Sequence, residues 1–459
     1  MKEAIDFSAF SPTDYRYAVD DLRAYLSDEA YVRYKAKIEA ALAQVFANLG
    51  LLKQELCDEI VAAASRITAA EVYKEEQKTK HDIRALVNVI RSRVSDETKP
   101  FVHLGATSYD VVDTANALRY KDAVLNVIIP DMLDLERIWM ALARREKNTL
   151  QIGRTHGQYA EPITFGFALA QYVNRWGSQI LKTKEASENL VGKFSGAVGA
   201  YNSTSLLIDE PEAFEREVLT ALNLKPAAIS TQIVPPEPMS DFVHAIISSF
   251  SVLANLCDDM RHLQRSEIGE VMERVAEEQV GSSTMPHKRN PIGFESVKSL
   301  WKKFMPQVVT MHLDQISEHQ RDLTNSASQR YTQELLVAFD YCVRKLKSIL
   351  ERLEVDRERM QENFLRAKDA VIAEPLYILL SYYGHPDAHE YVRRKSFQAY
   401  NENKSLKELV ESDPEISEYL RKFTSEQREM VFSPEKYTGI AAEKTEKVVS
   451  YWEEVFKDL

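Results

Sequence analysis

Residues 118–142, LRYKDAVLNVIIPDMLDLERIWMAL, decide the fold of this chain. Apolar side chains recur there at steps of seven, three and four, a spacing that places them along one side of an α-helix. A seam of this length is typical of a helix that packs against other helices. Pro130 lies within it, and we expect a kink there because proline removes a backbone hydrogen bond. The seam consists of Leu118, Leu125, Ile128, Met132, Leu135, Trp139 and Leu142.

Other long stretches repeat this helical periodicity, and each would form a helix about 40–60 Å long at about 1.5 Å per residue. The sequence therefore predicts an all-α fold, an elongated long-helix bundle flanked by two smaller helical domains. The seams are more apolar than one bundle needs, which favours an oligomer. The further stretches are 163–190, 239–278, 293–318 and 327–353, and the expected domains are 1–112, 113–366 and 367–459.

The bulk composition excludes several classes of protein. The 459 residues carry a formal net charge of −12, which argues against a nucleic-acid-binding surface. Three scattered cysteines predict neither a disulfide framework nor a metal finger. The first residues lack the apolar core of a signal peptide, and the most apolar run, 245–257, is too short to span a bilayer. We expect a cytoplasmic protein without a membrane partner.

Five polar segments interrupt the helical pattern and hold most of the reactive side chains. Each lies at or near an expected helix end, where backbone N–H groups are free to bind anions. Loops on a rigid helical frame are a common way to build an active site. The segments are KTKHDI (78–83), HLGATSYD (103–110), GRTHGQYAEP (153–162), GSSTMPHKRNP (281–291) and HQRDLTNSASQR (319–330).

Structural interpretations of these side chains stay open. Thr107 and Ser108 could cap the helix that follows them, and Lys288 and Arg289 could be a solvated pair. Five of the ten histidines are expected to be structural: His244, His262, His312, His385 and His389. Phosphate-binding loops, dinucleotide fingerprints and hydrolase elbows are absent from the sequence. We therefore expect chemistry by side chains alone, without a cofactor or a metal.

The segment GSSTMPHKRNP (281–291) closely resembles the signature loop of the fumarase/aspartase superfamily, whose members cleave C–N or C–O bonds by β-elimination. TSYDVVDTA (107–115) and GRTHGQYAEP (153–162) resemble the other two shared regions, in the same order. His287 is similar to adenylosuccinate lyases and carboxymuconate cycloisomerases, and His156 favours the lyases. KTKHD and RHLQRSE also resemble lyase motifs, except that Lys80 stands where asparagine is usual.

The resemblance implies a role for each matching residue. Ser282 would be the base and His156 the acid, with Glu295 as the partner of His156. Lys288 would stabilise the growing carboxylate charge, and His81 would orient the substrate. The implied substrate contacts are Arg16, Tyr17, Lys80, Asp82, Thr107, Ser108, Gln232, Ser283, Arg289, Asn290, Ser326 and Arg330.

The same resemblance implies a purine nucleotide substrate and a homotetramer in which three subunits share each active site. Members of the lyase family release fumarate from adenylosuccinate and from the succinylated carboxamide nucleotide SAICAR. Two alternatives stay open: another lyase or a 3-carboxymuconate cycloisomerase of the superfamily, and a helical scaffold without activity. The intact Ser282, Lys288 and His156 argue against the scaffold.

Overall fold

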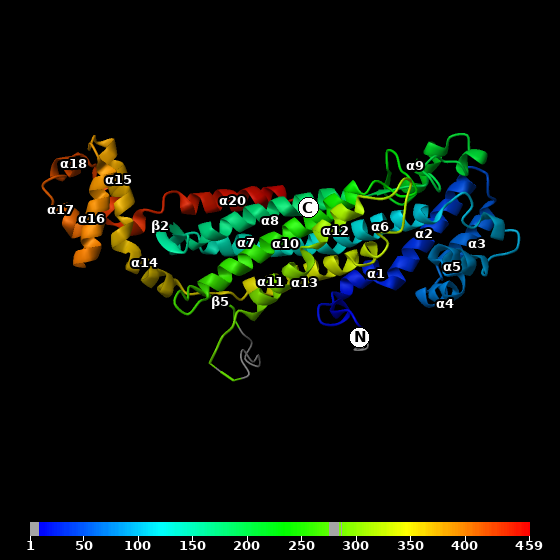
Figure 1. Ribbon diagram of the computed structural model, residues 1–459, viewed down its shortest axis with the longest axis horizontal. Coiled ribbons are helices and arrows are strands. Elements are labelled where there is room, and N and C mark those ends of the chain that lie inside the picture. Colours follow the sequence, from blue (N-terminus) through cyan, green and yellow to red (C-terminus); the bar gives the residue numbers. More distant parts are fainter. Residues whose placement is uncertain (1–8, 275–283, 286) are drawn as a thin grey trace. The chain divides into compact units, whose positions relative to one another are not determined.

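The computed structural model describes residues 9–274, 284–285 and 287–459, and its helices and short strands follow one another as in Figure 1. The helices are α1 (Arg23–Leu26), α2 (Asp28–Asn48), α3 (Gln54–Ala64), α4 (Ala69–Thr79), α5 (Asp82–Arg91), α6 (Ser108–Ala123), α7 (Ile129–Arg145), α8 (Phe165–Glu188), α9 (Pro211–Ala221), α10 (Glu237–Leu263), α11 (Ile292–Phe304), α12 (Gln307–Asp314), α13 (Thr332–Leu350), α14 (Arg357–Val371), α15 (Ala373–Tyr382), α16 (Ala388–Glu402), α17 (Leu406–Glu411), α18 (Ser417–Lys422), α19 (Ser425–Phe432) and α20 (Ala441–Val455). The strands are β1 (Leu150–Thr155), β2 (Gln158–Thr164), β3 (Val191–Gly192), β4 (Lys225–Pro226), β5 (Val271–Met272) and β6 (Glu354–Val355).

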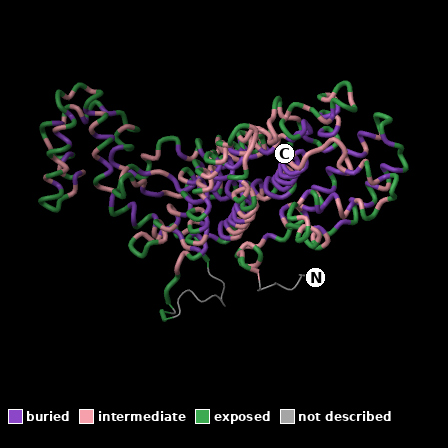
Figure 2. The backbone as a smooth tube through the Cα atoms, turned by 45° about the vertical axis from the view of Figure 1, so that its right-hand side comes forward, coloured by how far each residue is buried: buried purple, intermediate pink, exposed green. Residues whose placement is uncertain are grey.

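The seam that defines the fold is a helical run from α6 through a π-helical turn, Val124–Ile128, into α7. Pro130 is the second residue of α7, directly after that turn. In the π turn the backbone hydrogen bonds span five residues instead of four. The expected irregularity therefore lies just before Pro130, which has no N–H to donate. Six of the seven seam residues are buried, and Leu125 is half-buried. Figure 2 shows such buried positions along the long helices.

The contacts of the chain group into two compact units, described here one at a time. Unit 1 comprises 1–133, 178–253 and 299–344, and unit 2 comprises 134–177, 254–298 and 345–459. The chain passes from one unit to the other inside α7, α8, α10, α11 and α13. These contacts do not test the expected division into three domains, which stays a prediction.

Aromatic pairs mark the core of unit 1. Tyr120 of α6 stacks on Phe242 of α10 with ring centroids 6.1 Å apart. Phe250, two turns further along α10, meets Phe339 of α13 edge-on at 5.6 Å. These contacts join the three long helices through large buried side chains, which is the packing that the apolar periodicity predicts.

Unit 2 is centred on Trp139, which lies against Tyr172 and Trp176 of α8 at 5.7 and 6.2 Å. The last helix, α20, packs on α8 as well: Trp452 donates a hydrogen bond to Asn174 at 3.2 Å. Shorter helices, α15–α19, share a core of their own around Leu376, Tyr391 and Val410. These helices are 6 to 15 residues long.

Several expected helix boundaries were wrong. The stretch 239–278 ends as a helix at Leu263, and a turn follows in which Gly269 takes a positive φ of 66°. The stretch 293–318 is two helices, because Pro306 separates α11 from α12. The polar stretch 149–162 forms the β1–β2 hairpin, since its residues pair from Leu150↔Thr164 to Thr155↔Gln158.

Helix α10 is long and apolar enough to cross a membrane, judged by length and composition. Its most apolar window is 72% buried inside the protein, however. A core helix passes the same test, and Phe242 and Phe250 pack α10 against α6 and α13.

A close contact between α8 and α20 gives a first prediction. A Cβ atom on Gly177 would lie 2.5 Å from the indole of Trp452, which is buried. Gly177→Ala should therefore destabilise the protein by about 1–3 kcal/mol through overpacking. In a Trp452→Ala background the same change should instead be neutral or stabilising, by up to about 1 kcal/mol, because alanine favours helix. Denaturant unfolding of the four proteins checks this, and equal effects in both backgrounds would contradict the contact.

Candidate active site

The predicted site residues divide between the two units. Unit 2 holds the acid His156 and the residues around the signature loop, Lys288, Arg289, Asn290 and Glu295. The base Ser282 and its neighbour Ser283 lie outside the described residues. The remaining predicted positions all belong to unit 1: Arg16, Tyr17, Lys80, His81, Asp82, Thr107, Ser108, Gln232, Ser326 and Arg330.

His156 occupies the turn of the β1–β2 hairpin. His156 and Gly157 form a two-residue loop with φ of 52° and 76°, the left-handed values that a type I′ turn requires. Such turns favour Asn-Gly, and histidine is one of the few other residues that accept this conformation. The turn makes the His156 side chain exposed at the tip of the hairpin. A non-glycine residue with positive φ at an exposed tip suggests a functional constraint.

The base of the hairpin is fixed by Glu270, whose carboxylate is fully buried. Its Oε2 accepts a hydrogen bond from Gln151 at 2.8 Å. Its Oε1 accepts from Arg154 at 2.6 Å and from Asn363 of α14 at 2.9 Å. A buried carboxylate is stable only with such partners. Glu270 thus joins β1 to α14 and sets the direction in which the hairpin projects.

The last residues of the signature loop and the start of α11 are anchored by the side chains of Gln264 and Glu273. Gln264 donates to the carbonyl of Arg289 at 3.3 Å and accepts from the backbone N–H of Glu273 at 3.0 Å. Glu273 in turn accepts from the backbone N–H of Gly293, the second residue of α11, at 2.9 Å. Burial raises the pKa of Glu273 above its usual range. Gln264, from the RHLQRSE motif, therefore positions the exit of the loop.

Glu295 lies in the first turn of α11, and its side chain is exposed. Its ion-pair partner is Arg261 of α10, with the two groups 3.9 Å apart. Within the described part of the chain, no hydrogen bond or ion pair joins Glu295 to His156. The predicted partnership of these two residues therefore stays a prediction.

In unit 1, His81 and Ser108 meet at the starts of two helices. His81 caps α5, and its Nδ1 accepts the backbone N–H of Arg84 at 3.3 Å. That bond places the proton of the neutral ring on Nε2, which lies 3.4 Å from the Ser108 hydroxyl. His81 is therefore prepared to donate a hydrogen bond from Nε2 toward a ligand at the start of α6.

Thr107 is the N-cap of α6, as the structural interpretation of this segment proposed. Its backbone N–H donates to Asp110 at 2.8 Å. Asp110 also pairs with Lys193, and both side chains are buried. Lys193 donates to the carbonyl of Gly196 at 3.0 Å. This buried ion pair fixes the turn before α6, and with it the Thr107 and Ser108 groups.

Lys80 and Asp82, on either side of His81, have local structural roles. Lys80 ends α4 with a left-handed φ of 54°, a position that favours glycine or asparagine. The usual asparagine is thus explained by the backbone alone. Asp82 forms an ion pair with Lys35 at 3.1 Å. Burial would raise the pKa of Asp82, but the charge of Lys35 and its hydrogen bond outweigh burial and hold that pKa low.

The remaining predicted contacts of unit 1 lie around Arg321 and Arg330. Gln232 accepts from Arg321 at 3.4 Å, and the Arg321 guanidinium lies over the Tyr109 ring, 3.4 Å from its centroid. Arg330 is exposed and donates to the carbonyl of Ser326 at 2.6 Å. At the other end of the chain, Arg16 is exposed and Tyr17 half-buried.

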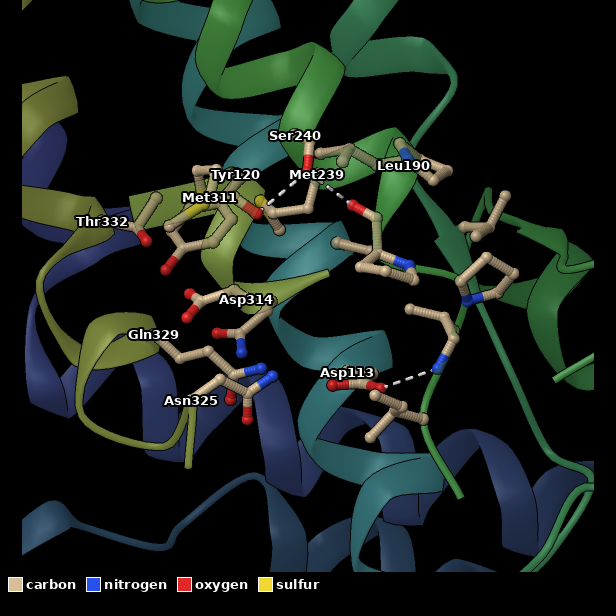
Figure 3. A pocket seen from close by; sticks show the side chains of 18 residues that line it. Asp113, Tyr120, Leu190, Met239, Ser240, Met311, Asp314, Asn325, Gln329 and Thr332 are labelled. Atoms are coloured by element: carbon tan, nitrogen blue, oxygen red, sulfur yellow. Dashed lines mark hydrogen bonds between the residues drawn. The ribbon is translucent and has the colours of Figure 1, made fainter. Parts of the chain in front are cut away.

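A cavity of about 70 Å³ lies in unit 1, lined by α6, α10, α12 and the segment before α13 (Figure 3). Asp113 lines it and accepts the backbone N–H of Val234 at 3.0 Å. Burial raises the pKa of Asp113 to about 6. Asn325 and Gln329, which also line the cavity, lie beside Ser326 and Arg330 in sequence.

The chain matches two family models, one described as lyase over residues 13–305 and one as adenylosuccinate lyase C-terminal over residues 317–438. It is 36% identical to the adenylosuccinate lyase of Pyrococcus abyssi, an alignment covering 97% of this chain and 99% of the relative. The chain belongs to the adenylosuccinate lyase family. The corresponding protein of Archaeoglobus fulgidus is 34% identical, with the same shares of the two chains covered.

Solved structures agree on the fold. The 3-carboxy-cis,cis-muconate lactonizing enzyme of Pseudomonas putida superposes with a TM-score of 0.82 at 24% identity, covering 96% of this chain and 99% of that one. A fumarate lyase from Mesorhizobium sp. BNC1 gives 0.83 at 24% identity, covering 95% and 98%. At this identity the likeness establishes a shared long-helix fold and no more. The all-α long-helix fold is thereby confirmed, while the family models and the relatives confirm the family resemblance.

Sequence reasoning missed the residues that hold the site rather than form it. Glu270 stands inside the stretch 239–278, which the sequence predicts to be helical, and it carries no motif of its own. Asp110 could have been found, because Thr107 and Asp110 have the spacing of a capping box. His103 lies in a polar segment, and its Nδ1 is 2.6 Å from the buried carboxylate of Glu39. The charge of Glu39 outweighs burial and raises the pKa of His103.

The Glu270 anchor gives a second prediction. Glu270→Gln keeps the shape of the side chain but leaves Arg154 without a counter-charge, so the hairpin should loosen. We expect turnover to fall about tenfold or more and stability to fall by about 3–5 kcal/mol, as for broken buried pairs. Glu267→Gln is the matched control, because Glu267 is exposed and pairs only with the exposed Arg265. Initial rates and thermal melts of both variants check this, and similar behaviour of the two would contradict it.

The buried Asp113 gives a third prediction, on pH. Because its pKa is about 6 in the fold and about 4 when unfolded, ionisation destabilises the protein as pH rises from about 4 to 6. Asp113→Asn can still accept from Val234. The variant should be more stable than the parent at pH 7, by at most about 3 kcal/mol, and equal to it near pH 4. Melting curves from pH 4 to 7 check this, with the exposed Asp209→Asn as the control.

Proposed function

We propose that this chain cleaves adenylosuccinate to AMP and fumarate, and SAICAR to AICAR and fumarate, by anti β-elimination. The observation that carries the proposal is His156, a titratable side chain held at the tip of an anchored hairpin. It stands within the segment that separates the lyases from the cycloisomerases. The relatives that cover nearly the whole chain bear the lyase name, which supports the same substrate.

The reaction needs a base, an acid and a site for negative charge. The base takes a proton from the carbon next to a carboxylate, and that electron pair becomes the C=C bond of fumarate. The C–N bond breaks, and the nitrogen receives a proton from the acid. Because the carbon acid is weak, the negative charge on the neighbouring carboxylate must be stabilised by donors placed beforehand.

His156 supplies the proton to the leaving nitrogen. Ser282 supplies the base, which requires an environment that favours its alkoxide. Lys288 and Asn290 are exposed or half-exposed just before α11, on the backbone that Gln264 anchors. In this proposal they donate to the carboxylate whose charge grows, since a nearby ammonium favours the ionised form of a carboxylate.

The residues of unit 1 bind rather than transform the substrate. Ser108 and Thr107, at the first turn of α6, offer hydroxyl and backbone donors to a succinyl carboxylate. His81, with its proton on Nε2, donates beside them. Arg16 and Arg330 are exposed guanidinium groups suited to a phosphate. No metal or cofactor enters this scheme.

We infer that the active enzyme is a homotetramer with sites shared between subunits. Exposed apolar side chains on one side of α12 and the turn after it support an association surface. Val309, Leu313 and Ile316 are spaced at four and three residues, and they are 56%, 65% and 76% exposed. A single subunit leaves this apolar stripe in water.

The His156 turn provides the fourth prediction. His156→Asn removes the acid but keeps a residue that favours the left-handed turn, so the fold should persist. Turnover of adenylosuccinate, followed by ultraviolet absorbance, should fall at least about 100-fold. Light scattering should give four times 52.5 kDa for parent and variant alike. His156→Ala should be as inactive and also less stable, by about 1 kcal/mol, because alanine strains the turn.

Ser282→Ala should lose turnover too, because it removes the proposed base. Near-parent rates in His156→Asn would refute the assignment of the acid.

A further inference from the structure

The N-terminal segment that carries Arg16 and Tyr17 lies along one face of α13. Three side chains of the segment each contact a side chain of that helix, by a hydrogen bond of 2.9 Å, a ring contact of 5.3 Å between centroids, and an ion pair of 2.7 Å. In chain order the pairs are Ser11 with Glu334, Tyr17 with Tyr341, and Asp21 with Arg344.

The helix side of these contacts is one continuous stripe. Glu334, Tyr341 and Arg344 follow at steps of seven and three, which places them on one face of a helix. Val337, between them on the same face, lines the groove in which Ser11 and Val19 also lie. The segment is thus attached along about three turns of α13, rather than at one point.

The last contact, Arg344, is held independently of the N-terminal segment. Its Nε pairs with Asp340 at 3.0 Å, and one terminal nitrogen pairs with Asp131 of α7 at 2.7 Å. Asp340 is fully buried, and Asp131 is largely so. The other terminal nitrogen meets Asp21, whose side chain is 65% exposed. Two fixed carboxylates therefore orient the guanidinium, and its free edge receives the carboxylate of the segment.

The start of the same helix holds the second pair of predicted substrate contacts. Gln333, in the first turn of α13, donates to the carbonyl of Arg330. Arg330 donates to the carbonyl of Ser326 at 2.6 Å. Both guanidinium groups expected to contact the substrate, Arg16 and Arg330, therefore belong to segments that α13 supports.

We propose that α13 is the element that positions the phosphate contacts of this enzyme, and that Arg344 is a positioning residue acting through Asp21 on Arg16 and Tyr17. This inference rests on the proposed function, because it assumes a phosphorylated substrate. Arg344 touches no substrate in this account. It fixes the end of the segment, and the two side chains four and five positions before Asp21 are thereby kept in place.

The test is the fifth prediction and uses Asp21→Lys in the full-length protein. A lysine there faces Arg344 with a like charge, so the segment should detach while the half-buried Arg344 stays paired with Asp131 and the buried Asp340. The KM for adenylosuccinate should rise roughly tenfold, with kcat changed less than about twofold. The inhibition constant of succinyladenosine, which lacks the phosphate, should stay within about twofold of the parent value.

Asp20→Lys is the matched control. Asp20 is the neighbouring exposed acid, and its ion-pair partner among the described residues is Arg23, three positions along the chain. Arg16→Ala sets the scale, because it should raise the KM for adenylosuccinate and spare succinyladenosine in the same way. Hydrogen exchange at residues 9–22 should be faster in Asp21→Lys than in Asp20→Lys, and this readout needs no activity.

Equal effects of Asp21→Lys on both ligands, or no effect on either, would overturn the inference. Unchanged hydrogen exchange at residues 9–22 would overturn it as well. A parent enzyme that does not cleave adenylosuccinate would instead refute the proposed function, and the phosphate role with it. Arg16→Ala without effect, in an active parent, would refute the role of the segment alone.

Discussion

The structure depends on the burial of the apolar seams of its long helices. Residues such as Trp139 and Phe250 are hidden only because neighbouring helices cover them. Their burial leaves little room for polar chemistry along the helix sides. Helix ends, in contrast, carry backbone groups without partners. In unit 1 the candidate groups therefore lie where α5, α6 and α13 begin, and in unit 2 they lie at the start of α11 and at the tip of the β1–β2 hairpin.

A second constraint is the free-energy cost of burying charged side chains beneath the candidate site residues. His156 is exposed and Thr107 half-buried, while the charges that fix the backbone around them are buried: Glu270 behind the hairpin of His156, and the Asp110–Lys193 pair behind Thr107. Buried charges are costly unless paired, and once paired they tolerate little displacement. Rigidity is thus concentrated one layer beneath the reactive side chains.

The sequence predicted the helical class, the seam and the family, because periodicity and motifs are local in the chain. A cap at Thr107 was one of the interpretations that the sequence left open, and the structure shows that cap. Glu270 could not be recognised, since its partners stand more than 90 positions away and carry no shared pattern. Arg344 was missed because Asp21 and Asp131 are likewise distant in the chain, and only Asp340 is near it. The end of α10 at Leu263 was missed because apolar and polar residues continue past it without a proline. In the sequence the hairpin was recognised only as an interruption of the helical pattern. His156-Gly157 between two short extended segments nevertheless has the form of a two-residue turn.

The C-terminal helix has a consequence for how the protein is made. Trp452 of α20 bonds Asn174 of α8, a residue synthesised 278 positions earlier. At about 5–20 residues per second, the surface of α8 that receives Trp452 waits tens of seconds on the ribosome for its cover. During that interval the apolar groove beside Gly177 is open to water and to other nascent chains. Slow translation and encounters with chaperones would therefore affect this protein most before its last helix emerges.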